Sequence, residues 1–110
     1  MDTTKAVNFE IILGATGSSR VRFEKRAGHI LGFVIQLECL IDDEWYPVVR
    51  YDTAHSFAHC DILRPGREAQ KIDLNIADYN SALTFAQKDI AERWRYYCER
   101  YGKWLKEERG

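Results

Sequence analysis

Hydrophobic and polar residues alternate over the first two thirds of the chain, and this pattern predicts β-strands. A period of two puts successive side chains on opposite faces, so that one face of a strand packs inward while the other meets solvent. The clearest segment, residues 30–41, places six side chains on one face: Leu31, Phe33, Ile35, Leu37, Cys39 and Ile41. The segments that we expect to form strands are residues 6–13, 20–25, 30–41, 45–52, 57–63 and, as a polar edge strand, 68–74.

Short runs of turn-forming residues separate these segments. Glycine and serine dominate residues 14–19, three acidic residues occupy 42–44, and Pro65 precedes Gly66 in the last turn. Connections this short join antiparallel neighbours, because parallel strands need a long crossover. The expected sheet is therefore an antiparallel β-meander of about five to six strands.

The periodicity changes near residue 79, where apolar residues begin to recur at steps of four and three. This stripe predicts an amphipathic helix over about 79–105, and it consists of Tyr79, Leu83, Ala86, Ile90, Trp94, Tyr97 and Tyr101. Asp78 is suited to cap the first turn, and Gly102 is expected to weaken or end the helix. We predict a single α+β domain over residues 1–110, with the helix packed on the sheet.

Charge and hydropathy exclude several classes of protein. The chain has 110 residues with 16 basic and 17 acidic side chains, and its formal charge of −1 provides no field that would attract nucleic acid in bulk. Residues 30–41 form the longest apolar stretch, which is too short for a bilayer. Residues 1–5 lack the basic and apolar pattern of a signal peptide. We therefore expect a cytoplasmic protein without a membrane association.

The three cysteines, Cys39, Cys60 and Cys98, are widely and irregularly spaced. No C-x-x-C pair is present, so neither a zinc knuckle nor a redox motif is indicated. Disulfide-rich secreted domains carry dense and even-numbered cysteines. The expectation is three reduced thiols, largely buried, in a cytoplasmic protein.

Two of the three histidines fall between Arg50 and Asp61. In the predicted strand 45–52, Arg50 and Asp52 share a face; in the next predicted strand, His59 and Asp61 share a face. A hairpin paired in simple register presents these four side chains on one surface, with His55 at its tip.

Three interpretations fit this group. In the first, His55 and His59 act as acid and base in metal-free cleavage of a phosphodiester, because the pKa of an imidazole lies near neutrality. Arg50 stabilises the charge on phosphate, and Asp52 or Asp61 orients a histidine. In the second, the histidines and aspartates bind a divalent transition metal ion. In the third, Asp52 caps the turn and the histidines are ordinary polar surface.

Arg20 and Arg22 lie on one face of the predicted strand 20–25. Such a stripe can bind phosphate groups locally even where the net charge is not positive, but a charged face in solvent is the simpler interpretation. With Asp61 they form the substrate-binding set that we predict, and no metal or other cofactor is included.

The run from Trp45 to Asp61, with its core Trp-x-x-Val-Val-Arg-Tyr-Asp-Thr-Ala-His, resembles a family of small uncharacterised prokaryotic proteins. The similarity extends through residues 77–86 into the predicted helix. The aspartate followed by histidines is also similar to the Asp-x-x-His…His pattern of the TumE-like toxins of toxin–antitoxin modules. That resemblance implies a ribonuclease-like or otherwise growth-inhibiting activity, carried at the matched positions Arg50, Asp52, His55 and His59.

Two functions of different class follow. In the first, the chain is a small hydrolase that cleaves RNA or a nucleotide phosphodiester, as a toxin or defence-module component with an antitoxin or other protein partner. In the second, it is a non-catalytic interaction or dimerisation module. Open edges of the meander and an aromatic helix end favour a homodimer in either case.

Overall fold

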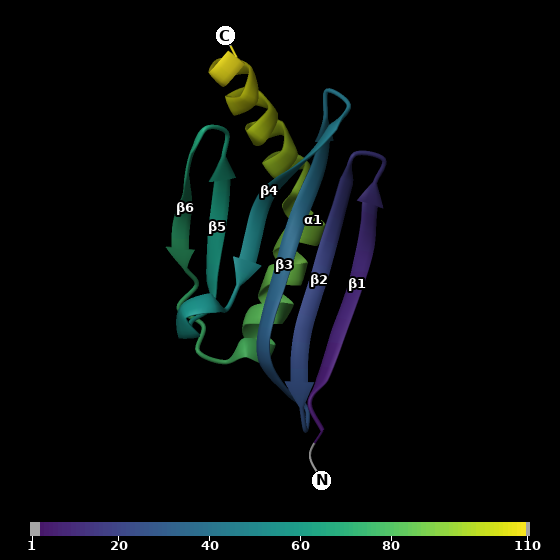
Figure 1. Ribbon diagram of the computed structural model, residues 1–110, viewed down its shortest axis with the longest axis vertical. Helices are drawn as coiled ribbons and strands as arrows, with labels where there is room; N and C mark the ends of the chain where they lie inside the picture. Colours follow the sequence, from purple (N-terminus) through teal and green to yellow (C-terminus); the bar gives the residue numbers. More distant parts are fainter. Residues whose placement is uncertain (1–2, 110) are drawn as a thin grey trace.

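Six antiparallel strands and one long helix make up the fold of residues 3–109, the part of the chain that the computed structural model describes (Figure 1). The strands are β1 (Lys5–Gly14), β2 (Gly17–Arg26), β3 (His29–Ile41), β4 (Glu44–Asp52), β5 (His59–Arg64) and β6 (Arg67–Asp73). A short 3-10 turn, η1 (Ala54–Ser56), lies between β4 and β5, and the helix α1 spans Tyr79–Arg109.

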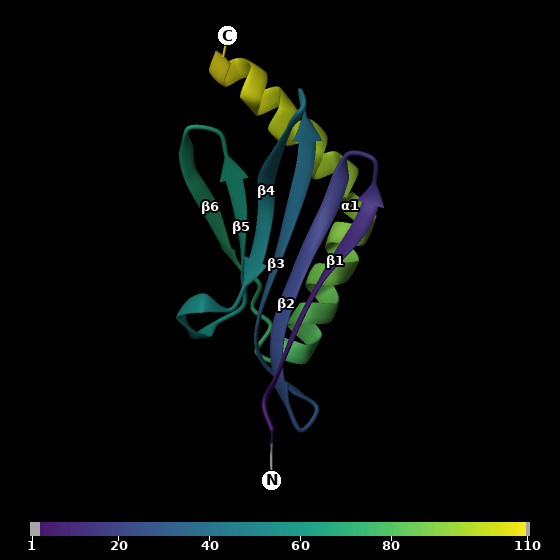
Figure 2. The same cartoon turned by 45° about the vertical axis from the view of Figure 1, so that its right-hand side comes forward.

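The sheet follows the chain in the order β1-β2-β3-β4-β5-β6, and every neighbouring pair is antiparallel. The predicted α+β meander with a C-terminal helix is therefore confirmed. Helix α1 packs across β2 to β5 on one face of the sheet, whereas η1 projects away from the helix (Figure 2). We call the face without the helix the open face. Within the described residues, no helix is long and apolar enough to cross a membrane.

The core lies between α1 and the covered face of the sheet. Alternate residues of β3 are buried against the helix, as their period of two predicts. The helical stripe is confirmed as well, because the buried residues of α1 are Ala82, Leu83, Ala86, Ile90, Trp94, Tyr97, Tyr101 and Leu105.

Two strands, β2 and β5, begin two or more residues away from their predicted starts. Strand β2 begins at Gly17, three residues before the predicted start, because Ser18 and Ser19 pair with both β1 and β3 and are buried there. Strand β5 begins at His59 because the preceding residues form η1, in which His55 has a φ of 68°.

Helix α1 begins where Asp78 caps it and continues past its predicted end. The backbone amides of Asn80 and Ser81 donate to the Asp78 carboxylate at 3.2 and 3.3 Å. Gly102 does not end the helix, because Tyr101 and Leu105 bury their side chains against the sheet. Packing of this face outweighs the low helix propensity of one glycine.

The expectation of three reduced thiols is wrong. Cys39 of β3 and Cys98 of α1 form a disulfide that joins the helix to the sheet, while Cys60 is free and buried. The two bonded residues are 59 positions apart in the sequence, so only the packing of α1 on β3 reveals that they meet. The cysteines thus no longer argue for a cytoplasmic location, which stays a prediction.

Candidate functional site

The open face carries the polar residues of the strands in register. Arg50 lies opposite Asp61, and Asp52 lies opposite His59, across β4 and β5. The simple hairpin register expected from the sequence is therefore the one that forms. The rows extend across β2 and β3, so that two lines of neighbouring residues cross the open face: Arg20, Gln36, Arg50 and Asp61, and beside them Arg22, Val34, Asp52 and His59.

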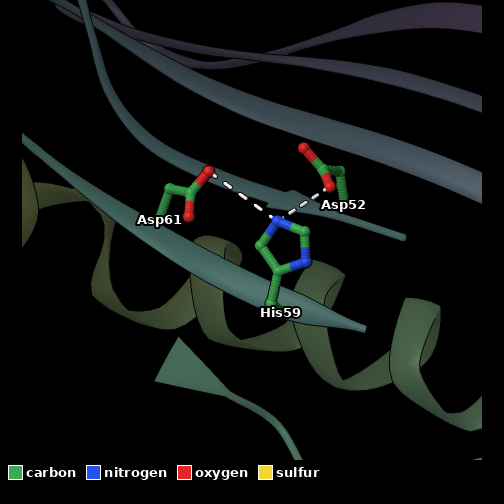
Figure 3. A group of neighbouring side chains, drawn as sticks. All are labelled: Asp52, His59 and Asp61. Carbon is green, nitrogen blue, oxygen red and sulfur yellow. Dashed lines mark ion pairs between the residues drawn. The ribbon is translucent and has the colours of Figure 1, made fainter. Parts of the chain in front are cut away.

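His59 stands between two carboxylates (Figure 3). Its Nε2 lies 2.9 Å from Oδ1 of Asp52 and 3.8 Å from Oδ2 of Asp61. The His59 side chain is only 1% exposed. The rings of Phe57 and His55 lie 5.2 and 6.4 Å from its ring, centroid to centroid. The imidazole is thus enclosed within the protein, with two other rings near its own.

Both ring nitrogens of His59 face oxygen atoms. Nδ1 lies 3.3 Å from the carbonyl oxygen of Phe57, which can only accept, so this contact is a hydrogen bond when Nδ1 carries the ring proton. Nε2 faces the Asp52 carboxylate, which also accepts. A ring proton on Nε2, or a bound cation, joins this nitrogen to the carboxylates, because lone pairs on nitrogen and oxygen repel each other.

Asp52 is fixed by further donors. The backbone amide of Ala54 donates to Oδ1 at 2.9 Å, in the manner of an Asx turn. Nε of Arg50 lies 3.5 Å from Oδ2. The half-exposed guanidinium of Arg50 and the buried imidazole of His59 thus adjoin the carboxylates of Asp52 and Asp61.

The same residues meet the requirements of a metal site. One ligand atom from each of Asp52, His59 and Asp61 lies within 4.8 Å of the other two, the single such group among the described residues. Donors at about 2.0–2.2 Å from one ion lie roughly 3–4 Å apart, which fits the distances from Nε2. Oδ1 of Asp61 is buried and has no hydrogen-bond partner among the described residues. A divalent transition metal ion thus fits in place of the shared proton.

A hollow of about 380 Å³ opens beside this cluster. We call it the Arg22–Arg50 hollow. Two arginines and the Asp52 carboxylate line it, together with Phe23, Glu24, Gly32, Phe33, Val34, Thr53 and Ala54. Its size is that of a small-ligand site. Asp52 lines the hollow and His59 does not. Asp52 is therefore the residue of this pair that a bound ligand can contact.

The other predicted residues lie around this centre. His55 is exposed on η1, away from the carboxylates, and only its ring approaches His59. Arg22 lines the hollow, whereas Arg20 lies two residues along β2 and pairs with Glu38, with Nε 3.3 Å from Oε1. The structure therefore brings Arg22, Arg50, Asp52, His59 and Asp61 together and leaves His55 on the loop.

Trp45 is the residue of the open face that the sequence pattern misplaces. Strict alternation along β4 puts it on the same face as Val49 and Tyr51, which are buried. A β-bulge shifts the register between Leu37 and Glu38, however, so that the alternation of β4 reverses. Trp45 consequently lines a second hollow together with Ser18, Arg20 and Glu38. Two adjacent buried valines, Val48 and Val49, are the signal in the sequence that could have indicated the bulge.

A family described as "Domain of unknown function (DUF7718)" matches residues 1–107. No curated protein and no solved structure matches the chain. The expectation of an uncharacterised family is thus confirmed over residues 1–107, whereas its assignment to the Arg-Tyr-Asp-x-x-His core stays a prediction. The similarity to TumE-like toxins stays a prediction that depends on Arg50, Asp52, His55 and His59.

Proposed function

We propose, for a chain that belongs to the DUF7718 family, that it cleaves a phosphodiester of RNA or of a nucleotide in the Arg22–Arg50 hollow. The observation that carries this proposal is the carboxylate–imidazole pair of Asp52 and His59, joined at 2.9 Å, at the wall of a hollow with two arginines. Guanidinium groups bind phosphate through charge-assisted hydrogen bonds, and a hydrogen-bonded acid–base pair beside them can move a proton.

Each residue has a role in this reaction. Arg22 and Arg50 bind the phosphate and offset the charge that grows on its oxygens. The attacking hydroxyl group gives its proton to Asp52, which touches the substrate, while His59 positions that carboxylate from behind. As the new phosphorus–oxygen bond forms, the bond to the leaving oxygen breaks. Water gives this oxygen a proton, because His55 does not line the hollow.

The test is cleavage of a fluorogenic single-stranded RNA by the purified chain and its variants. Asp52→Asn and Arg50→Gln are each expected to lower the rate at least about 100-fold, as the loss of a base or a charge-stabilising group does. Asp43→Asn, in the exposed β3–β4 turn, is the matched control and should leave the rate unchanged. Intact RNA with the wild-type chain, or equal rates for all variants in folded form, would refute the proposal.

Chelation separates the two forms of the site. With a shared proton between His59 and Asp52, an excess of EDTA leaves the rate within about twofold, because the proton transfer needs no metal. Loss of activity with EDTA and recovery with Mn²⁺ or Zn²⁺ would instead assign Asp52, His59 and Asp61 as metal ligands. His59→Gln should abolish that recovery.

A non-catalytic dimerisation module is the second candidate, and the outer edge of β1 favours it. Among residues 3–109 this strand pairs only with β2, and Phe9, Ile11 and Ile12 along it are exposed. A long apolar edge strand is a template for pairing with another chain. If this is the function, the wild-type chain is a dimer by light scattering, and Phe9→Lys with Ile11→Lys gives a monomer.

A further inference from the structure

A second hollow, of about 520 Å³, lies on the open face near the β1–β2 turn. We call it the Trp45 hollow. Its lining residues differ from those of the Arg22–Arg50 hollow. It lies farther along the same strands, since Arg20 of β2 lines one hollow and Arg22 lines the other. Trp45 and Arg50, which line the two hollows, are five residues apart on β4, about 13–17 Å along the strands. A single extended ligand of several repeating units can therefore occupy both hollows.

Two large apolar side chains form the walls of the Trp45 hollow. Trp45 is 50% exposed and Ile12 is 70% exposed, although the open face around them is polar. Exposed apolar side chains that gather at a concavity with a polar rim are typical of ligand-binding grooves. A flat ring that stacks on the indole would bury both side chains.

Polar groups occupy the floor and the edge of the same hollow. Ser18 is buried at the floor, and its hydroxyl oxygen has no hydrogen-bond partner among the described residues. Arg20 and Glu38 form an ion pair at the edge, and the Arg20 side chain is largely in solvent. The hollow therefore offers donors and acceptors next to an aromatic wall, which suits a planar ring with polar atoms on its rim.

We infer that the Trp45 hollow binds a nucleobase of a single-stranded nucleic acid, stacked on Trp45, whose phosphate backbone continues along the open face into the Arg22–Arg50 hollow. Stacking on an aromatic side chain combined with a cationic groove is the general way in which single strands are held. This inference rests on the proposed function for the phosphate in the first hollow. It also explains how a chain with a net charge of −1 can bind RNA. Stacking of a base on an aromatic side chain does not depend on net charge.

Binding of two probes tests the inference. The first probe is a short fluorescein-labelled oligoadenylate with 2′-O-methyl groups, which prevent cleavage at that hydroxyl. The second is an abasic oligomer of the same length, which keeps the phosphates and lacks the bases. Fluorescence anisotropy gives the affinity of each probe for the wild-type chain, Trp45→Ala, Trp45→Phe and Arg50→Gln. Tyr96→Ala is the matched control, since Tyr96 is 48% exposed and lies on α1, away from the open face.

Trp45→Ala is expected to weaken binding of the oligoadenylate about tenfold and to leave binding of the abasic oligomer unchanged. Trp45→Phe should restore most of the lost affinity, which a merely structural defect would not allow. Arg50→Gln should weaken both probes, and Tyr96→Ala neither. Equal affinity of the wild-type chain for the two probes would overturn the nucleobase site while the phosphate site stands. No measurable binding of either probe would overturn both.

Discussion

The hydroxyl group of Tyr51 in β4 donates a hydrogen bond of 2.5 Å to Oδ2 of Asp89 in α1. Tyr97 donates to the same oxygen at 2.5 Å, and Nη1 of Arg93 lies 3.6 Å from Oδ1. Burial first, and then the hydrogen bond to Asp89, raise the pKa of both phenols well above its usual range, so that both stay protonated as donors. On the covered face, the sheet and the helix are thus joined by a polar contact as well as by the apolar core.

Removal of the Tyr51 hydroxyl should destabilise the fold while leaving the ring in place. We expect Tyr51→Phe to lower the free energy of unfolding by about 1–2 kcal/mol, because a hydrogen bond to a charged partner is lost. Denaturant unfolding with a constant slope measures this change. Tyr96→Phe, which alters an exposed phenol, should stay within about 0.5 kcal/mol of the wild type. Equal effects of the two variants would contradict a stabilising role for the Tyr51–Asp89 contact.

Two glycines should respond to alanine in opposite directions. A Cβ on Gly17 would lie 2.4 Å from Cε3 of Trp94, so Gly17→Ala must displace a buried indole and is expected to cost about 1–3 kcal/mol. A Cβ on Gly102 meets nothing nearer than 4.0 Å, at Ile41. Gly102→Ala should therefore stabilise α1 by about 0.5–1 kcal/mol through backbone entropy. Thermal unfolding of both variants checks the signs, and a stable Gly17→Ala variant would count against the close packing of Trp94.

Thiol counting tests the disulfide between Cys39 and Cys98. In the folded chain no thiol should react with Ellman's reagent at pH 8, because burial raises the pKa of the Cys60 thiol to about 12. Denaturation without reductant should expose one thiol, and reduction should release all three. Reduction is also expected to lower the free energy of unfolding by about 2–4 kcal/mol. Three reactive thiols in the denatured chain without reductant would instead restore the expectation drawn from the spacing of the cysteines.

The cap at Asp78 should make helix stability depend on acid pH. Hydrogen bonds from the Ser81 side chain and from the Asn80 amide lower the pKa of this carboxyl below its ordinary value of 3.8. The carboxylate therefore stabilises the folded state above that value, and the contribution disappears as the pH falls through the lowered pKa. Asp78→Ala should be less stable than the wild type at pH 7, with a smaller difference near pH 2. A difference that does not change with pH would assign the effect to helix propensity rather than to the charge.

The local pattern of the chain was enough to predict the elements and one pair of strands in register. Alternation in β3 and the stripe of α1 depend only on which side chains avoid water, and short turns leave little choice but a meander. The facing of Arg50 with Asp61 and of Asp52 with His59 follows from the same alternation across a tight hairpin. Cap formation by Asp78 is equally local, since a carboxylate reaches the amides two and three residues ahead.

Tertiary structure decided the properties of the site. Alternation puts His59 on the open face, but only the loop with Phe57 and His55 around it explains why it is buried there. Contacts between distant segments, such as Cys39 with Cys98, cannot be recognised from the residues near each cysteine. They form only because the whole helix packs on the sheet and brings the two segments together.

The β-bulge in β4 is a second feature that the pattern of the sequence does not predict. One extra residue reverses the alternation and turns Trp45 to the open face, where it lines a hollow with Ser18 and Arg20. By itself, the sequence therefore determined which residues lie on which strand or helix. Only the packing of those elements decided which of the residues meet, because burial and distance depend on all the strands together.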